Sequence, residues 1–472
     1  MGAWGCRSAP RTGADEAPPK PPPPLDTPYA DEDVGREAAE QAGAQLGEVR
    51  DPELSAYVNA IGQRLAHHAP GFSFDYRFTI IDEDTPNAFA LPGGYVFVSR
   101  GLLALSNSEA EIAGVLGHEI AHVALRHAAA RQRVGGSGVM QLLQMPYLAA
   151  YDRRLEHSAD RVGQGLAAVA GYDPDGISGF LQSLDAYERV RSGASRIPSF
   201  FDTHPGAVGR AADTAQRAQG IRWNARPGFS TNRDDYLRRL DGLVVGQSGE
   251  QGIFQDSRFL HADLAFTLRF PDEWDTINTP QAVGALSPDR QAQVFLEAAS
   301  AGEDAAQAAA EWVEEGHDEG LRVFESASVK LAGRQAHRIT GSVRGAAGSI
   351  RLVATFIPWR GRIYRLIGVS ASGMRHDAMF VSVARSFRPM TPELLAQVRE
   401  TRLRLAEARA GETLAELSKR TGNVWSLPLT AVLNDRRSDH RFAGGELVKV
   451  GRSEPYGQTA PEGVARDAGP RT

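Results

Sequence analysis

The sequence predicts a multidomain α+β protein. Its 472 residues are enough for about three domains of ordinary size. Residues 31–249 are dominated by helical spacing of apolar side chains, whereas residues 255–392 alternate strand-like and helix-like runs. Apolar residues make up 42% and charged residues 23% of the chain, as is ordinary for a globular protein. No uninterrupted apolar stretch of ~18 residues occurs, so we expect no transmembrane helix.

Charge and cysteine content exclude several classes of protein. The 52 Lys and Arg residues stand against 58 Asp and Glu, a formal net charge of −6, and without a long basic run this argues against nucleic-acid binding. The single cysteine, Cys6, excludes an internal disulfide and a CxxC zinc site. Any metal site must therefore use His and carboxylate ligands.

Cys6 has two interpretations. It is either a leftover thiol in a tail or, with Gly5 before it, a residue that resembles the acylation site of a bacterial lipoprotein. The second interpretation places the protein in the periplasm or at the outer membrane of a bacterium. Membrane contact is then expected only through a lipid anchor at Cys6.

The first part of the chain divides into a tether and a folded unit. Residues 1–30 are rich in proline, favour extended polyproline geometry and cannot form a core, so we interpret them as a tether. Helical spacing follows over residues 32–68. Residues 72–82 are β-rich, and residues 87–99 predict a strand, a Pro-Gly-Gly turn and a second strand.

Two further helices are expected in this unit, which ends near Gly249. The first has about 25 residues and opens near Ser106 or Ser108, because Ser108 and Glu111 form a capping box. The second covers residues 156–170 and ends where Gly171 and a nearby proline stop it.

Residues 255–392 are expected to form a separate α+β domain, with a helix over residues 305–315. Its strand-like runs begin at Phe266, Val294, Leu352 and Tyr364. Residues 404–452 form a third, smaller unit, and residues 453–472 form a tail rich in Gly and Pro.

The motif His118-Glu119-Ile-Ala-His122 carries the strongest chemical signal. On a helix, positions i and i+4 lie on one face, so two imidazoles can reach one Zn²⁺ with the carboxylate of Glu119 beside the open position. Fewer than about 0.04 such motifs are expected by chance at this composition and length. Two satisfied core histidines and a solvated Glu119 are the alternative. The flanking residues are apolar, however, and burying these groups on such a helix is costly unless they are ligated.

The third ligand decides the subclass of metal site. A metzincin needs glycine and histidine where this chain has Leu125 and Ala128. His127 is one residue out of register, so we expect it to cap the helix or to support a ligand from behind. A gluzincin needs a glutamate from a second helix.

Glu156 on the second predicted helix supplies that glutamate. Asp160 lies one turn further on the same face, so Glu156 can bind the metal while Asp160 accepts the free N–H of a ligand histidine. If His118 and His122 were absent, we would interpret Glu156 and Asp160 as part of an ordinary solvated face of a helix.

Five motifs together resemble one family of zinc metallopeptidases, which includes HtpX, the CAAX prenyl endopeptidases and the BepA-type periplasmic proteases. The resemblance covers roughly residues 32–220. In chain order the motifs are Asn87-Ala-Phe-Ala-Leu-Pro-Gly-Gly, His118-Glu-Ile-Ala-His122, Glu156-x-x-Ala-Asp160-x-x-Gly163, Gly171-Tyr-Asp-Pro and Thr203-His204-Pro205.

The resemblance implies a mainly helical gluzincin domain with a small β-sheet, and one Zn²⁺ per chain. It implies that His118, His122 and Glu156 are the metal ligands and that Glu119 is the general base. In this chemistry zinc-bound water attacks the peptide bond while Glu119 takes up the proton. His204 matches the family's Thr-His-Pro histidine; it either hydrogen-bonds the oxyanion, occupies the open zinc position at rest, or merely begins a helix before Pro205.

Two segments near the motif also have functional interpretations. An extended substrate can add as a further strand to the predicted strand that contains Asn87, Ala88, Phe89, Ala90 and Leu91, unless this strand only forms a hairpin. Residues 134–150, between the two ligand helices, are either a lid over the zinc or a packing linker.

The remaining units resemble other modules. The run Phe266-Thr-Leu-Arg-Phe-Pro-Asp-Glu-Trp resembles the opening of PsbP-like domains. Gly411-Glu-Thr-Leu and Gly445-Glu-Leu-Val-Lys-Val resemble a LysM module, a small βααβ glycan-binding fold. Residues 404–452 therefore either hold the protein near peptidoglycan or only stabilise their neighbours.

We expect a zinc endopeptidase of the bacterial cell envelope that acts on unfolded or misassembled proteins. Two alternatives stay open. One is a cell-wall chaperone or binding module whose proteolysis is blocked by His204 or by residues 134–150. The other is an endopeptidase that cleaves peptidoglycan cross-links.

Overall fold

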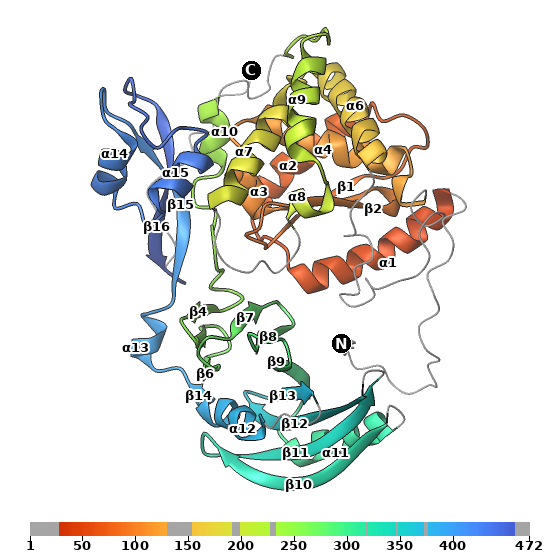
Figure 1. Ribbon diagram of the computed structural model, residues 1–472, viewed down its shortest axis with the longest axis vertical. Helices are drawn as coiled ribbons and strands as arrows, with labels where there is room; N and C mark the ends of the chain where they lie inside the picture. The colour runs from red at the N-terminus through yellow and green to blue at the C-terminus, as the bar shows by residue number, and fades with distance from the viewer. Residues whose placement is uncertain are drawn as a thin grey trace.

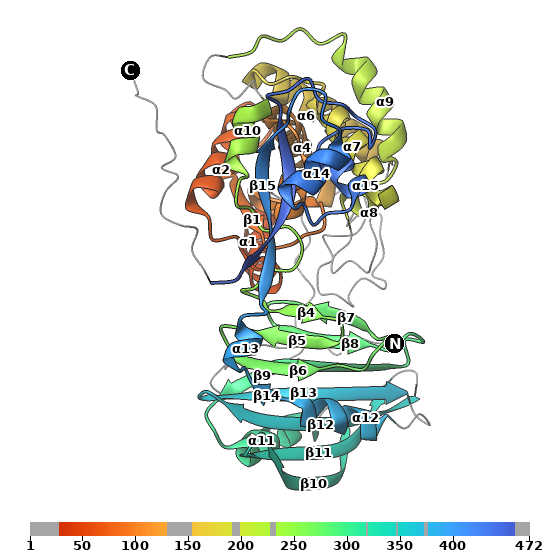
Figure 2. The ribbon, with the colours of Figure 1, turned by 90° about the vertical axis from the view of Figure 1, so that its left-hand side faces the viewer.

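The computed structural model describes residues 28–129, 153–190, 199–226, 233–317, 320–345, 348–371 and 376–457 (Figure 1). The predictions for Cys6 and most of the tether, for the segment 134–150 and for the end of the tail lie outside these residues. Helices gather at one end of the molecule and most strands at the other, in both ribbon views (Figures 1 and 2). The fold is therefore mixed α+β, as the sequence predicts.

A three-stranded sheet lies within the helical end. Its order is β1-β3-β2, with β1 (Arg77–Ile81) parallel and β2 (Ala88–Leu91) antiparallel to β3 (Tyr95–Ser99). The Pro-Gly-Gly turn between β2 and β3 is the short helix η1 (Pro92–Gly94), where Gly93 and Gly94 have φ of 80° and 98°. The predicted hairpin is thus present, and β2 lies at the edge of the sheet.

Helices surround this sheet and form with it the largest apolar core among the described residues. Buried side chains of this core include Ile61, Leu116 and Phe180, from three different helices. The helices of this end are α1 (Pro28–Leu46), α2 (Pro52–Ala66), α3 (Arg100–Leu105), α4 (Glu109–Ala124), α6 (Arg153–Ala170), α7 (Gly176–Val190), α8 (Phe200–Thr203), α9 (Ala207–Ala218) and α10 (Arg233–Arg239).

Helix α4 lies at the centre and packs against α2, α6, α7 and β2. The side chain of Ser108 accepts a hydrogen bond from the Glu111 amide at 3.2 Å, so the helix begins at the predicted cap. It has 16 residues rather than the expected 25 or so, because the chain leaves the helix after Ala124 and Arg126 adopts φ of 53°.

Two glycines allow α4 and α6 to approach closely. A Cβ atom at Gly163 would lie 2.7 Å from the His118 backbone nitrogen, and one at Gly117 would lie 2.9 Å from the Gly163 carbonyl oxygen. No larger residue fits without moving backbone. This contact places the N-terminal half of α6 against the His-Glu-x-x-His turn.

The opposite end, residues 253–389, contains two antiparallel sheets that lie below the helices in Figure 2. Phe259, Phe266 and Phe356 are among its buried aromatic side chains. Its helices are α11 (Ala305–His317) and α12 (Asp377–Ser386). The seven-stranded sheet has the order β10 (Leu321–Leu331), β11 (Arg334–Gly345), β12 (Gly348–Trp359), β13 (Arg362–Ala371), β9 (Ala292–Ala301), β8 (Ala282–Leu286) and β7 (Asp275–Asn278). The four-stranded sheet has the order β14 (Arg388–Pro389), β6 (Phe266–Arg269), β5 (Arg258–His261) and β4 (Ile253–Gln255).

After the short helix α13 (Pro392–Leu395), the chain returns to the helical end and forms a βααβ unit. Its elements are β15 (Arg399–Glu407), α14 (Leu414–Thr421), α15 (Leu427–Leu433) and β16 (Leu447–Pro455). Leu403 and Leu433 of this unit are buried in the largest core of the helical end. The unit is therefore docked on the helices rather than suspended from them.

A cavity of about 870 Å³ lies between the helical end and the sheets. Glu48 and Asp51 line it from one side, and Phe259, Phe266 and Tyr364 from the other. Its lining contains none of the predicted site residues. No helix in the part of the chain that the structure describes is long and apolar enough to cross a membrane.

Candidate metal centre

His118 and His122 turn toward one point from successive turns of α4. Their Nε2 atoms lie 2.9 Å apart, and the two side chains are buried. Two neutral imidazole nitrogens at this separation would repel each other through their facing lone pairs. The repulsion is removed if one nitrogen carries a proton or if both bind a cation. The i, i+4 spacing of the motif thus produces the expected convergence.

The other ring nitrogen of each histidine has its own partner. His118 Nδ1 lies 2.9 Å from Asp160 Oδ1, and His122 Nδ1 lies 2.9 Å from His127 Nδ1. Such partners hold a metal-binding imidazole in the tautomer whose Nε2 is available. Asp160 and His127 are therefore placed behind the two histidines.

Glu156 completes a triangle with the two histidines. It is the fourth residue of α6, and its Oε2 and Oε1 lie 3.5 Å from His118 Nε2 and 3.4 Å from His122 Nε2. Burial raises the pKa of Glu156, but the neighbouring histidines offset this and hold its pKa well below the usual range. The carboxylate is thus ionised beside two imidazoles.

Glu119 lies next to this triangle on α4 and is completely buried. Its Oε1 is 3.3 Å from His204 Nε2, and neither oxygen has a well-formed hydrogen bond from the described residues. Burial raises the pKa of Glu119 to about 7, and the Glu156 charge acts in the same direction. A carboxyl group with this pKa can both accept and return a proton near neutral pH.

His204 follows α8 and reaches the same cluster. One atom each from His118, His122, Glu156 and His204 lies within 4.8 Å of the others. The His204 ring stacks on Phe200 at 4.1 Å, and its Nδ1 lies 2.9 Å from Thr203 Oγ1. Burial lowers the pKa of His204 to about 3, so its imidazole is neutral.

The predicted substrate strand lies beside the cluster. Asn87 Oδ1 accepts a hydrogen bond of 3.4 Å from Thr203 Oγ1, which links this strand to His204. Because the Ser99 amide donates to the Asn87 carbonyl, the alternation of an antiparallel ladder turns the backbone groups of Ala88 and Ala90 away from β3. The edge of β2 that faces away from the sheet thus borders Glu119, whose pKa the Ala90 backbone lowers.

The donor set fits a zinc ion. Two histidine nitrogens and a carboxylate oxygen are a known zinc set that leaves one position open. Oε1 of Glu156, which faces His122, has no hydrogen bond from the described residues, although burying such an atom without a partner is costly. Buried nitrogen and oxygen donors that converge on one point are the arrangement that a metal ion requires.

Arg210 was not among the residues predicted from the sequence. Its side chain is buried at the start of α9 and donates hydrogen bonds to Asp160 and Glu156. Arginine is usually exposed, and no spacing rule connects it to a site 50 residues away. Its position six residues after His204 is the one local signal.

This geometry defines a class of protein, the metallopeptidases with a His-Glu-x-x-His helix and a glutamate on a second helix. The sequence also matches the model of peptidase family M48, over residues 52–145 and 134–218. Residues 52–218 are therefore similar to that family, and this similarity supports a metal cofactor.

Named relatives agree with this assignment. The chain is 30% identical over 235 residues to the "Beta-barrel assembly-enhancing protease" of Escherichia coli (strain K12), covering 44% of this chain and 47% of that protein. It is 31% identical over 171 residues to the "Mitochondrial metalloendopeptidase OMA1" of Schizosaccharomyces pombe, covering 33% of this chain and 50% of that protein. The chain thus spans about half the length of the curated relatives it matches.

Among solved structures, cyanobacterial PsbP from Synechocystis sp. PCC 6803 is similar to 31% of this chain and 98% of that chain. The identity is 14% and the TM-score 0.24. A likeness of this size bears on neither family nor activity.

Proposed function

We propose that this protein is a zinc-dependent endopeptidase of the bacterial cell envelope that cleaves unfolded or misassembled proteins. The observation that carries the proposal is the convergence of His118, His122 and Glu156, with Glu119 beside them. The family match and the envelope protease among the relatives support it. Protein or peptide substrates follow from the same relatives.

The residues have distinct tasks in this reaction. His118, His122 and Glu156 would hold Zn²⁺, which supplies Lewis acidity toward the scissile carbonyl and toward water. Glu119 takes a proton from the attacking water and returns it to the leaving amine nitrogen. The outward backbone groups of Ala88 and Ala90 pair with an extended substrate, which aligns one peptide bond with Glu119.

Glu119→Gln tests the assignment of the base. The amide keeps the size of the side chain but cannot accept the proton, so cleavage of an unfolded model protein should fall by ~100-fold or more while zinc content is unchanged. Glu53→Gln, an exposed glutamate on α2, is the matched control and should cleave like wild type. Wild-type cleavage by zinc-loaded Glu119→Gln would refute the mechanism.

His204 favours a second candidate function, a binding module or chaperone with silenced proteolysis. If its Nδ1 donates to Thr203 Oγ1, the lone pair of Nε2 faces the metal position and can block it. If Thr203 donates instead, Nε2–H can stabilise an oxyanion. The two tautomers thus correspond to the two predicted roles.

His204→Ala separates these roles. Removal of a blocking group should raise the initial cleavage rate several-fold, whereas removal of an oxyanion donor should lower it by ~100-fold or more. An increase supports the self-blocked form, and a decrease supports a catalytic role. The comparison requires equal zinc content in both proteins, measured before the assay.

We further propose that the βααβ unit contacts peptidoglycan and that Cys6 carries a lipid anchor. The βααβ order of residues 399–455 and their similarity to a LysM module support the first. Lys449 and Leu433 face the helices, so a glycan would bind the opposite, exposed side. Cosedimentation of the Glu119→Gln protein with purified sacculi tests this contact. The contact would be refuted if all of the protein stayed in the supernatant.

A further inference from the structure

Arg210 contacts three residues of the candidate metal centre, two on α6 and one directly after α8. Its Nε and Nη2 donate to the two oxygens of Asp160 at 2.8 and 2.7 Å, as a bidentate fork. Its Nη1 donates to Glu156 Oε2 at 2.5 Å and to the His204 carbonyl oxygen at 3.2 Å. One guanidinium therefore joins α6 to the segment between α8 and α9.

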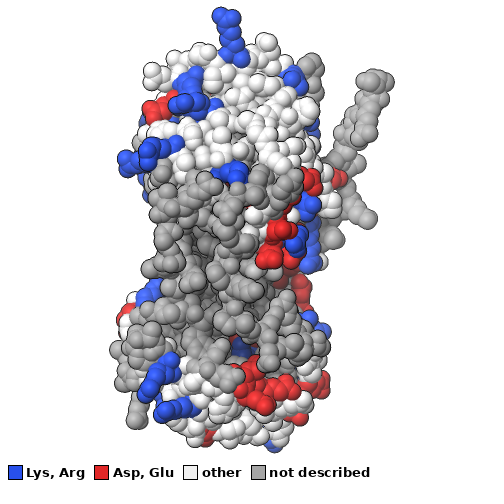
Figure 3. All heavy atoms as spheres, turned by 90° about the vertical axis from the view of Figure 1, so that its right-hand side faces the viewer, with Lys and Arg blue, Asp and Glu red and all other residues white. Residues whose placement is uncertain are grey.

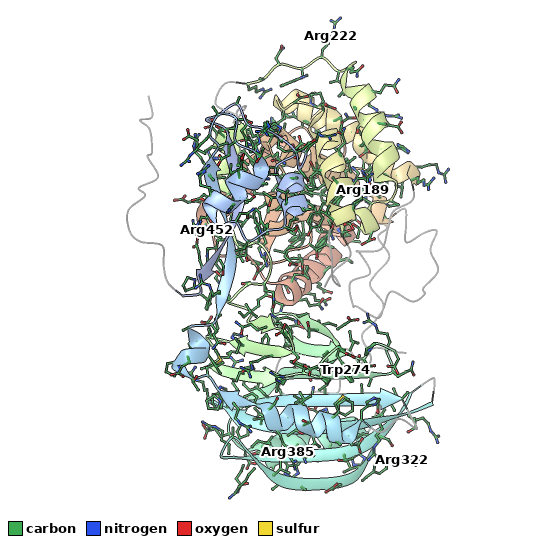
Figure 4. The ribbon with its side chains drawn as sticks, turned by 60° about the vertical axis from the view of Figure 1, so that its left-hand side comes forward. Arg189, Arg222, Trp274, Arg322, Arg385 and Arg452 are labelled. Atoms are coloured by element: carbon green, nitrogen blue, oxygen red, sulfur yellow. The ribbon has the colours of Figure 1, made fainter. Side chains whose placement is uncertain are left out.

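Arg210 is buried, in contrast to arginines at the surface of this chain. Arg189 and Arg222, labelled in Figure 4, are exposed, whereas Arg210 is only 2% exposed. Figure 3 shows exposed basic side chains on one face of the molecule, some of them beside acidic ones. A cation is buried in this way only where charged partners offset the cost of removing it from water.

The contact to Glu156 selects one of its two oxygens. Oε2 accepts a hydrogen bond from Arg210 and lies 3.5 Å from His118 Nε2, while Oε1 has no hydrogen bond from the described residues and lies 3.4 Å from His122 Nε2. Asp160, held by the same guanidinium, in turn contacts His118 Nδ1. Arg210 therefore orients two ligand side chains at once.

The charge balance of the site also depends on Arg210. Glu119, Glu156 and Asp160 are buried carboxylates within reach of the Arg210 charge. Together with a divalent cation, the single charge of Arg210 balances the three carboxylates. An uncompensated buried carboxylate would otherwise be costly.

We propose that Arg210 is a positioning residue for the metal centre, which presents Glu156 through Oε1 alone and fixes His118 through Asp160. The inference rests on the proposed metal-dependent function and extends it to a residue that touches neither metal nor substrate. A lysine cannot replace it, because one ammonium cannot reach both Asp160 oxygens, Glu156 and the His204 carbonyl together.

Arg210→Lys tests the proposal, because it keeps the charge but loses the fork. Zinc affinity is measured by competition with a chromophoric chelator, in a Glu119→Gln background that prevents self-cleavage. We expect zinc binding 10- to 100-fold weaker, as for other residues that orient metal ligands. Arg217→Lys on the same helix, whose side chain donates to Gln164 Oε1 at 2.7 Å, should bind zinc like its parent.

Unchanged zinc affinity in Arg210→Lys would overturn the proposal. Where that variant does not fold, X-ray absorption at the zinc edge of the parent protein decides: one carboxylate oxygen from Glu156 supports the proposal and two oxygens refute it. Neither readout depends on proteolysis. If the Glu119→Gln test fails, the proposed proteolytic reaction is refuted. The zinc measurements would still test the role of Arg210, because they do not depend on that reaction.

Discussion

Single residues behind the metal ligands determine how the ligands are presented. If His122 binds a cation through Nε2, its Nδ1 carries the proton and donates to His127 Nδ1 at 2.9 Å. His127 Nε2 then donates to Ser158 Oγ at 3.1 Å, and Ser158 donates to the Leu155 carbonyl oxygen at 2.8 Å. Every donor in this series of hydrogen bonds has an acceptor, and the series ends at Leu155, next to Glu156.

We expect His127→Leu to weaken metal binding by ~10- to 100-fold, because it removes the acceptor that holds the His122 ring. The adjacent His157 is the matched control: it is a half-buried histidine on α6 whose Nδ1 lies 3.8 Å from an exposed Asp213 carboxylate. His157→Leu should bind metal like wild type. Titration with Co²⁺, followed by visible absorption, gives both affinities. Equal affinities for His127→Leu and wild type would contradict the proposed role of the hydrogen bonds through His127.

At the scale of elements, the distance between α4 and α6 decides whether the ligand-bearing turns of the two helices form one site. The helices meet at Gly117 and Gly163, where the backbones are too close for a side chain. Gly163 lies three positions after Asp160, so the same contact brings Asp160 and Glu156 to the His118 turn. Helix spacing here is part of the metal site.

Gly163→Ala should lower the free energy of unfolding by about 1–3 kcal/mol, because the new Cβ would meet backbone atoms of α4 at 2.7–2.8 Å. Gly165→Ala is an internal control on the same helix, since its Cβ would have no atom within 4 Å. Alanine favours helix, so this control should be neutral or slightly stabilising. Urea denaturation monitored by circular dichroism measures both, and equal stability of the two variants would argue against a tight helix contact.

At the scale of the whole molecule, the βααβ unit is attached to the helical end by a buried lysine. Lys449 is inaccessible to solvent, and its Nζ donates to the carbonyl oxygens of Ala104 and Ser106, each at 2.8 Å. These carbonyls lie at the C-terminus of α3 and directly before α4, and burial lowers the pKa of Lys449 well below its ordinary value. The unit thus supports the start of the helix that carries His118.

Lys449→Met should destabilise the protein by about 1–3 kcal/mol, because the buried carbonyls at the end of α3 lose their donor. Methionine has a similar length, so loss of packing is small. Lys419→Met, at an exposed position on α14 of the same unit, should change stability by less than about 0.5 kcal/mol. Differential scanning calorimetry of the full chain distinguishes the two, and an unchanged Lys449→Met transition would show that the contact is dispensable.

Local pattern predicted much of this protein. The hairpin around the Pro-Gly-Gly turn, the start of α4 at Ser108 and the helix that contains Glu156 all follow from short-range rules, because caps, turns and periodicity act within a few residues. The length of α4 was overestimated, because apolar spacing continues past Ala124 although the backbone does not. The close contact of the last unit with the helices was not foreseen either, because no sequence pattern shows which surfaces meet.

The chemistry of the centre follows from the spacing of His118, Glu119 and His122 on one helix, because this spacing allows few other uses. The more distant residues of the centre are evident only in the folded chain. Arg210 and the pairing of His127 with His122 come from packing of α4, α6 and α9, and that packing depends on side-chain complementarity across the core. Ligand spacing is a property of one helix, whereas the orientation of each ligand is set by neighbours brought together by folding.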